Sequence, residues 1–260
     1  MVRKLTTLAV VALALVGMTV LNMYWEPQRI TAAQDEAARE AAEKLAQAKQ
    51  AQQQAAATAE GQAEEAAGDG EAVLEDMADW PEKTPDSFRV AFETTMGTFE
   101  VECNRAWSPN GADRFYELVR KGYYDGNRFF RVVKEPRPFV VQFGINGSPE
   151  VSKKWVNKMI KDDPVMQSNT EGYVTFAKSS QPNSRTTQIF INLTNNSSLD
   201  RDGFAPFAKV VKGLEVVKSL NGQYGERPTQ TQSQIHRYGN EFLDQQFPGL
   251  DYVRKARLVK

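Results

Sequence analysis

Short runs of β-branched and aromatic residues, each bounded by turn-forming residues, follow one another from Pro85 to the end of the chain. Such runs are typical of β-strands. Two segments carry helical signals instead: one opens at Ser108-Pro109, and the other covers residues 214–220. Many short strands with two helices indicate a mainly β fold, a barrel with helical plugs, and disfavour a sheet of βαβ units. Strands are expected at residues 89–93, 98–103, 129–133, 139–143, 173–177, 188–192, 207–211, 252–253 and 257–259.

Composition divides the chain into three regions. Residues 1–25 are apolar after a basic start, residues 26–84 are rich in Ala, Gln and Glu, and residues 85–260 carry the strand pattern. We therefore expect a membrane anchor or signal peptide, a linker and one folded domain of ordinary size.

The apolar stretch from Leu5 to Tyr24 is long enough, as a helix, to cross a bilayer core. Arg3 and Lys4 precede it, which predicts a cytoplasmic amino-terminal end and a domain on the periplasmic side of the inner membrane. Secretion after signal cleavage is the alternative. However, the nearest small-residue site, at residues 31–33, lies well beyond the apolar stretch, so an uncleaved anchor is favoured.

The linker has many good helix formers but almost no large apolar residue. Between Gln34 and Glu65, Leu45 is the one exception, so the seam of a coiled coil is missing. A solvated single helix and a disordered spacer both remain open for this region.

Charge and composition exclude several classes of function. The net charge of −1 gives no electrostatic footprint for nucleic acid. One cysteine, Cys103, excludes an intramolecular disulfide framework and a multi-cysteine metal site. One histidine, His236, excludes a His-rich zinc site and disfavours a His-dependent triad. We therefore expect chemistry without a metal or a cofactor.

Arg131 is the residue that most directly suggests a site. It lies among apolar residues of an expected strand, where a guanidinium is costly unless it has partners or a ligand. Seven residues after it begins a second such run, residues 138–144, which contains Gln142. The alternative is that Arg131 extends to solvent from a strand end, with Phe139 and Phe190 as ordinary core residues.

Five stretches of the third region form a set with a characteristic order and spacing: residues 122–126 (GYYDG), 129–131 (FFR), 138–142 (PFVVQ), 187–192 (TQIFIN), and 199–200 (LD) followed by 207–210 (FAKV). On these stretches the third region resembles the cyclophilins, the peptidyl-prolyl cis-trans isomerase family, along nearly its whole length. Gly239-Asn240-Glu241-Phe242 and the residues after it are similar to a bacterial branch. The resemblance implies a closed eight-stranded antiparallel barrel capped by two helices.

The resemblance also implies roles for individual residues. Arg131 matches the catalytic arginine, and Gln142 matches the glutamine that contacts the substrate backbone. Phe130 stands where many members have histidine, and Val140 replaces a usual methionine of the pocket. The substrate-binding residues that the resemblance implies are Phe139, Gln142, Phe190, Leu199, Gln188, Phe130 and Val140.

The expected function is therefore that of a membrane-tethered prolyl isomerase that acts on Xaa-Pro bonds of folding or flexible polypeptides outside the cytoplasm. Such bonds isomerise slowly enough to limit folding. The expected catalytic domain is monomeric and needs no cofactor. Two alternatives stay open: a proline-peptide binding module with little turnover, and a scaffold domain of the cell envelope.

Overall fold

The computed structural model describes residues 82–259. The expected anchor, residues 1–25, and most of the expected linker lie outside this range. Among the helices of residues 82–259, none combines the length and the apolar character needed to span a bilayer.

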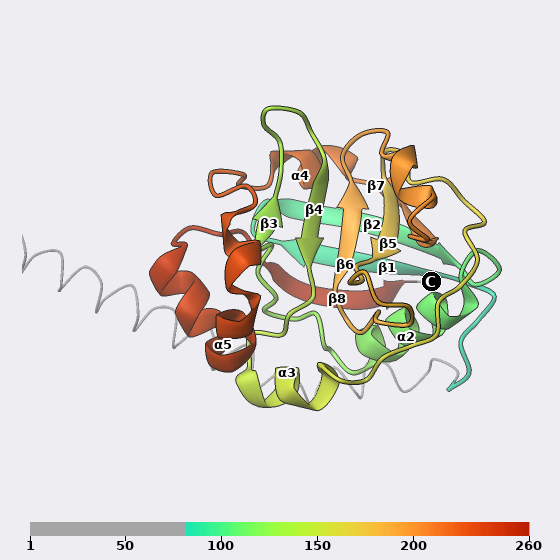
Figure 1. The fold of residues 1–260 in the computed structure, drawn as a ribbon, viewed down its shortest axis with the longest axis horizontal. Coiled ribbons are helices and arrows are strands. Elements are labelled where there is room, and N and C mark those ends of the chain that lie inside the picture. The colour runs from blue at the N-terminus through green and yellow to red at the C-terminus, as the bar shows by residue number, and fades with distance from the viewer. Residues whose placement is uncertain (1–81, 260) are drawn as a thin grey trace, which may run out of the picture. The chain divides into compact units, whose positions relative to one another are not determined.

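The described residues form one eight-stranded antiparallel sheet in the order β3-β4-β6-β5-β7-β2-β1-β8 (Figure 1). The mainly β prediction is thus confirmed, and every strand overlaps an expected run. The strands are β1 (Ser87–Thr94), β2 (Gly97–Asn104), β3 (Arg131–Val132), β4 (Val140–Phe143), β5 (Tyr173–Phe176), β6 (Ile189–Asn192), β7 (Pro206–Lys212) and β8 (Val253–Val259).

Strands β1 and β2 show why the sequence pattern predicts the sheet. Buried and exposed residues alternate along both strands, so one face carries apolar side chains into the core. Thr94 pairs with Gly97 at the turn, where Gly97 has a φ of +127° that other residues rarely adopt. Cys103 is fully buried on the core face, and burial raises the pKa of its thiol well above its ordinary value.

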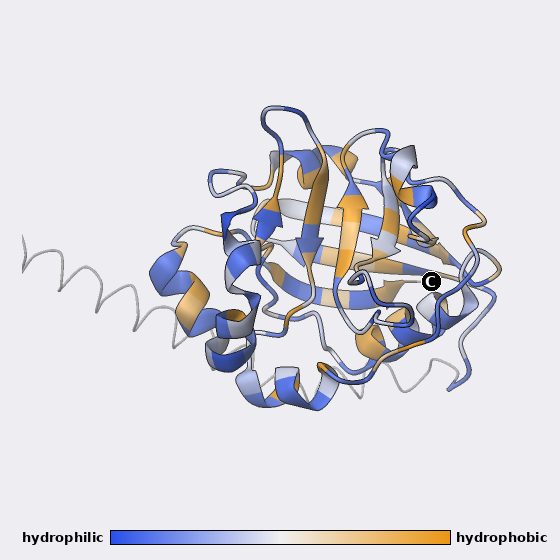
Figure 2. Cartoon of the chain, in the orientation of Figure 1, coloured by the Kyte–Doolittle hydropathy of each residue, from blue (hydrophilic) through white to orange (hydrophobic). Residues whose placement is uncertain are grey.

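The sheet curls until its two end strands, β3 and β8, approach each other. An isolated bridge joins Arg128 to Tyr252, and the Phe129 amide donates to the Asp251 carbonyl at 2.9 Å. The ladder itself does not join β3 to β8. The eight strands therefore form a curled half-barrel rather than the closed barrel that the resemblance implies. Apolar residues recur along the strands (Figure 2), and their buried members form one core cluster.

Two helices lie where the sequence predicts them: α2 (Pro109–Arg120) and α4 (Leu214–Ser219). The expectation of two helices is nevertheless wrong, because the described chain also has α3 (Pro149–Trp155) and α5 (Gln232–Gln246), with the short 3-10 helices η1 (Ser197–Asp200) and η2 (Arg227–Thr231). Helix α5 gave no clear signal because it is largely polar and contains a glycine.

That glycine, Gly239, fixes α5 to the rest of the domain. Its φ is +63°, and a Cβ atom there would lie 1.9 Å from the Gly147 carbonyl oxygen. The close approach lets the Asn240 amide donate to the same oxygen at 3.0 Å. Beneath α5 lies a second, small apolar cluster, formed by Phe130, Ile145, Ile235, Leu243, Phe247 and Leu250. This docking holds the segment that precedes α5, which contributes to the site.

Candidate active site

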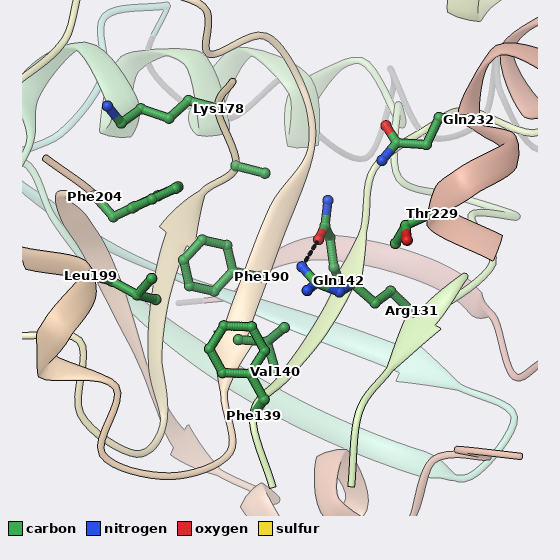
Figure 3. Close-up of a pocket in the computed structure, with 11 residues that line it drawn as sticks. Arg131, Phe139, Val140, Gln142, Lys178, Phe190, Leu199, Phe204, Thr229 and Gln232 are labelled. Carbon is green, nitrogen blue, oxygen red and sulfur yellow. Dashed lines mark hydrogen bonds between the residues drawn. The ribbon is translucent and has the colours of Figure 1, made fainter. Parts of the chain in front are cut away.

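A cavity of about 260 Å³ opens between β3, β4, the segment after β5, η1 and η2 (Figure 3). Its polar side carries Arg131, Gln142, Thr229 and Gln232. Its other side is mostly apolar, with one lysine at the edge. This second set consists of Phe139, Val140, Ala177, Lys178, Phe190, Leu199 and Phe204.

Arg131 reaches the cavity from β3. It pairs in register with Gln142 of β4, and its Nη1 donates to the Gln142 Oε1 at 2.9 Å. Its Nη2 donates to the Glu226 Oε1 at 2.6 Å, and its guanidinium carbon lies 5.3 Å from the centre of the Phe139 ring. The arginine side chain is 21% exposed and the Glu226 side chain 55%. Arg131 is thus oriented by a buried amide and an exposed carboxylate.

A row of amide side chains continues from the arginine. Gln142 Nε2 donates to the Gln188 Oε1 at 2.9 Å, and Gln188 Nε2 donates to the Gln232 Oε1 at 3.0 Å. Gln232 and Glu226 flank the single short helix η2. The two ends of η2 therefore both hold the Arg131 guanidinium. Glu226 accepts its hydrogen bond directly, whereas Gln232 acts through Gln188 and Gln142.

The apolar side is built from aromatic rings and aliphatic side chains. The Phe190 and Phe204 rings meet edge to face, with centroids 5.7 Å apart. Val140 and Phe190 are buried, whereas Leu199 is half-buried at the end of η1. A recess of this size and lining suits a small apolar ring.

Buried polar groups hold this apolar wall in place. Asp200, next to Leu199, accepts hydrogen bonds from the Ser168 hydroxyl at 2.5 Å and from the Asn169 amide at 2.9 Å. Burial by itself raises the pKa of Asp200, but these hydrogen bonds outweigh it, and its pKa is lower than its ordinary value. The Asn169 side chain also donates to the Phe204 carbonyl at 2.8 Å, so a single asparagine links both parts of the wall.

The structure brings most of the sequence-predicted site residues together. Gln188 is not part of the cavity wall but contacts it through Gln142. Those that line the cavity are Arg131, Phe139, Val140, Gln142, Phe190 and Leu199.

Phe130 is the exception, and the structure does not support its assignment as a substrate contact. It is buried in the cluster beneath α5 with Ile235 and Leu243. Neighbouring residues of an extended segment point to opposite sides, so Phe130 points away from the cavity that Arg131 enters.

Several cavity residues were missed by the sequence analysis. Lys178 and Phe204 lie in loops where no strand or helix pattern assigns a direction, although the aromatic residue directly after Gly203 is a weak signal. A polar segment before and at the start of α5 supplies three more residues of the site: Thr229, Gln232 and the nearby Glu226. It reaches the cavity only because α5 docks on the domain, and its local sequence does not signal this.

Comparisons with known proteins agree with this arrangement. The family model described as Cyclophilin type peptidyl-prolyl cis-trans isomerase/CLD matches residues 89–240. Peptidyl-prolyl cis-trans isomerase A of Dickeya dadantii (strain 3937) is 34% identical over 140 residues, which cover 52% of this chain and 72% of that protein. Peptidyl-prolyl cis-trans isomerase B of Escherichia coli (strain K12) is 30% identical over 141 residues, 51% of this chain and 84% of that protein.

Relatives also come from outside the bacteria. A peptidyl-prolyl cis-trans isomerase of Arabidopsis thaliana is 34% identical over 150 residues, 55% of this chain and 85% of that protein. The crystal structure of a cyclophilin type peptidyl-prolyl cis-trans isomerase from Cryptosporidium parvum shares the fold, with a TM-score of 0.50 and 17% identity over 67% of this chain and 98% of that chain. The fold, the cavity and the family match over 89–240 together show that this chain belongs to the cyclophilin family of peptidyl-prolyl cis-trans isomerases.

Proposed function

We propose that the enzyme catalyses rotation about Xaa-Pro peptide bonds in this cavity. The proline ring lies against the apolar wall, and Arg131 lies at the reacting amide. The chain is a peptidyl-prolyl cis-trans isomerase by family. The observation that carries the assignment of the site is the position of the Arg131 guanidinium, at the border between the apolar wall and the row of glutamines.

The mechanism follows from the electronic structure of the peptide bond. Amide resonance imposes a rotation barrier of ~18–20 kcal/mol. In the twisted state the lone pair of the prolyl nitrogen is no longer delocalised and can accept a hydrogen bond. A guanidinium donor at that nitrogen binds the twisted state better than either planar state, which is the condition for catalysis. No covalent intermediate is required.

The neighbours of Arg131 have supporting roles in this proposal. Gln142 of β4 accepts the hydrogen bond of Nη1 and itself lines the cavity. Glu226 holds Nη2 from the solvent side, so the guanidinium keeps its orientation when no substrate is present. Preorganised donors of this kind cost little reorganisation during the reaction.

A binding module with little turnover is a second candidate. The observation in its favour is that the Arg131 Nη2 and Nη1 both already have acceptors, at 2.6 Å and 2.9 Å. If Glu226 and Gln142 retain these hydrogen bonds when peptide binds, the arginine has less freedom to follow the rotating nitrogen.

A protease-free exchange assay by NMR on an Ala-Pro peptide separates the two candidates. Arg131→Ala is expected to reduce kcat/KM roughly 10²–10³-fold, the usual cost of removing one preorganised donor. Arg89→Ala is the matched control, because Arg89 is also a strand arginine paired with a glutamate, Glu102, at 3.1 Å but away from the cavity. Equal rates for wild type and Arg131→Ala would favour the binding module.

We further propose that the enzyme is a member of the bacterial branch, anchored in the inner membrane with a monomeric catalytic domain on the periplasmic side. The basic start and apolar stretch of residues 1–25 support this, as does the similarity of the tail to bacterial cyclophilins. Its substrates would then be proline-containing polypeptides that fold outside the cytoplasm.

A topology experiment tests the anchor. An alkaline phosphatase fused after Lys260 is expected to be active, and the fusion protein is expected to remain in the membrane pellet after alkaline carbonate extraction. Release of an active, shortened protein into the periplasmic fraction would support the secreted alternative. An inactive fusion would contradict both.

A further inference from the structure

Two cationic side chains line the cavity, and they differ in whether a carboxylate pairs with them. Arg131 is paired with Glu226, with 2.6 Å between Nη2 and Oε1. Lys178 lies on the opposite side of the cavity (Figure 3), and none of the ion pairs within residues 82–259 includes it. The contact of its ammonium group is with an aromatic ring, that of Phe204, at 5.3 Å from Nζ to the centroid.

The surroundings of Lys178 explain why its charge stays uncompensated. Gly203 has a φ of +75°, and a Cβ atom there would lie 3.5 Å from the Lys178 Nζ. The ammonium group therefore lies beside a residue that has no side chain to pair with it. The carboxylate of Asp200 already accepts hydrogen bonds from Ser168 and Asn169. Asp202 is exposed and makes no ion pair with the lysine within the described part of the chain.

Lys178 is also placed to meet a bound peptide. The ring that it covers, Phe204, packs edge to face on Phe190, which forms the apolar wall. A peptide whose proline contacts that wall occupies the cavity that Lys178 also lines, so a residue next to the proline can reach the lysine. Because Arg131 is neutralised by Glu226, the remaining charge that a substrate meets in this cavity is positive.

We propose that Lys178 forms a subsite for an acidic side chain next to the proline, so that the preferred substrates are Xaa-Pro segments flanked by Glu or Asp. This inference rests on the proposed function of the cavity. Lys178 is half-buried and the charge pair would be partly screened, so the expected preference is modest, about two- to fivefold in kcat/KM for a Glu over a Gln peptide.

The test compares peptides that differ at one position only. Glu, Gln, Ala and Lys are placed directly before or directly after the proline, and kcat/KM of the full-length chain is measured by NMR exchange, which needs no protease. We expect the Glu peptide of one position to exceed its Gln counterpart and the Lys peptide to be the poorest. Raising the ionic strength to about 1 M, where the Debye length is about 3 Å, should remove the difference.

Charge variants of Lys178 test the assignment to this residue. The Glu-to-Gln ratio should fall to one in Lys178→Met, and Lys178→Glu should prefer the Lys peptide. Lys209→Met is the matched control, because Lys209 also covers a ring, that of Tyr173 at 5.1 Å, but does not line the cavity. That variant should keep the wild-type ratio.

Each outcome bears on one of the two proposals. Equal turnover of Glu and Gln peptides at both positions, or a ratio that survives in Lys178→Met, would overturn the acidic subsite while turnover of the Ala peptide upholds the isomerase. If no peptide is turned over, the proposed function of the cavity fails. Peptide affinity measured by fluorescence anisotropy then decides the charge preference by itself.

Discussion

Two arginines of the domain, Arg185 and Arg131, have opposite surroundings. The Arg185 side chain is 2% exposed and contacts the Asp163 Oδ2 at 3.0 Å, the Ser108 Oγ at 3.3 Å and the Lys161 carbonyl oxygen. Arg131 borders a cavity, and one of its partners is the exposed carboxylate of Glu226. The Asp163 and Ser108 acceptors of Arg185 are buried, whereas Arg131 has one exposed acceptor and a cavity beside it.

The residues around Arg185 have a structural role, because they connect the loop that contains Asp163 to the start of α2. Asp163 also accepts hydrogen bonds from the Asn110 amide at 3.1 Å and the Gly111 amide at 3.0 Å, at the start of α2. Ser108 occupies the cap position of this helix but makes no capping hydrogen bond there, and its hydroxyl donates to Asp163 instead. The aspartate thus caps the helix from a distant loop. An arginine among apolar residues of a folded domain therefore indicates a site when a cavity lies beside it, as at Arg131, and a structural role when buried acceptors enclose it, as at Arg185.

The largest expected effect is on stability, from Asp163→Asn. Removing one partner of a buried ion pair leaves the other charge uncompensated, at a cost of about 3–5 kcal/mol in the free energy of unfolding. Urea unfolding at constant m-value measures it. Asp244→Asn is the control, since the Arg128–Asp244 pair at 2.9 Å is largely exposed on the acid side and should be worth less than about 1 kcal/mol. Equal losses would contradict the structural role of the cluster.

A smaller effect is expected from pH. Burial favours a raised pKa for Asp163, but hydrogen bonds from Ser108, Gly111, Asn110 and Arg185 outweigh it and lower the pKa. Because the folded pKa lies below the unfolded one, the stabilisation is complete above the unfolded value of about 3.9 and is lost as pH falls through the folded pKa. Unfolding free energy between pH 5 and pH 2 should therefore decline less steeply in Asp163→Asn than in wild type. Parallel curves would refute this.

The apolar wall should contribute to binding more than to rotation. Leu199→Ala removes part of the surface that contacts the proline ring in both planar and twisted states, so KM is expected to rise roughly tenfold with little change in kcat. Val211→Ala, at an exposed position of β7, is the control. A fall in kcat with unchanged KM would mean that Leu199 acts on the twisted state.

The smallest effect is expected at Glu226. Glu226→Gln removes the charge that holds the Arg131 Nη2, so kcat should fall about two- to fivefold as the guanidinium loses order. If Glu226 acts through Arg131, the same change should have no further effect in an Arg131→Lys background. An equal loss in both backgrounds would show an independent role.

The sequence was sufficient for the strands and for most of the apolar wall, although not for Phe204. Alternation along β1 and β2 marks the buried face, and the runs around Arg131, Gln142 and Phe190 lie on neighbouring strands. It was insufficient where distant segments meet. Helix α5 is polar and interrupted by glycine, so neither its docking nor the place of the segment before it could be predicted from local patterns.

Phe130 shows a second limit of prediction from the sequence. The resemblance to the cyclophilins places Phe130 among the substrate-binding residues, yet its side chain packs in the cluster beneath α5 while Arg131 lines the cavity. Residue spacing predicts which positions are close in space but not which of them share a cavity once a helix covers one face.

We expect Arg131, unlike Arg185, to exchange its partners for a prolyl peptide. NMR of the arginine side-chain Nε–Hε resonances during titration with an Ala-Pro peptide measures this exchange at both residues. The Arg131 resonance is predicted to shift and broaden with peptide exchange while that of Arg185 stays unchanged. An Arg131 resonance that does not respond to saturating peptide would contradict the proposed mechanism.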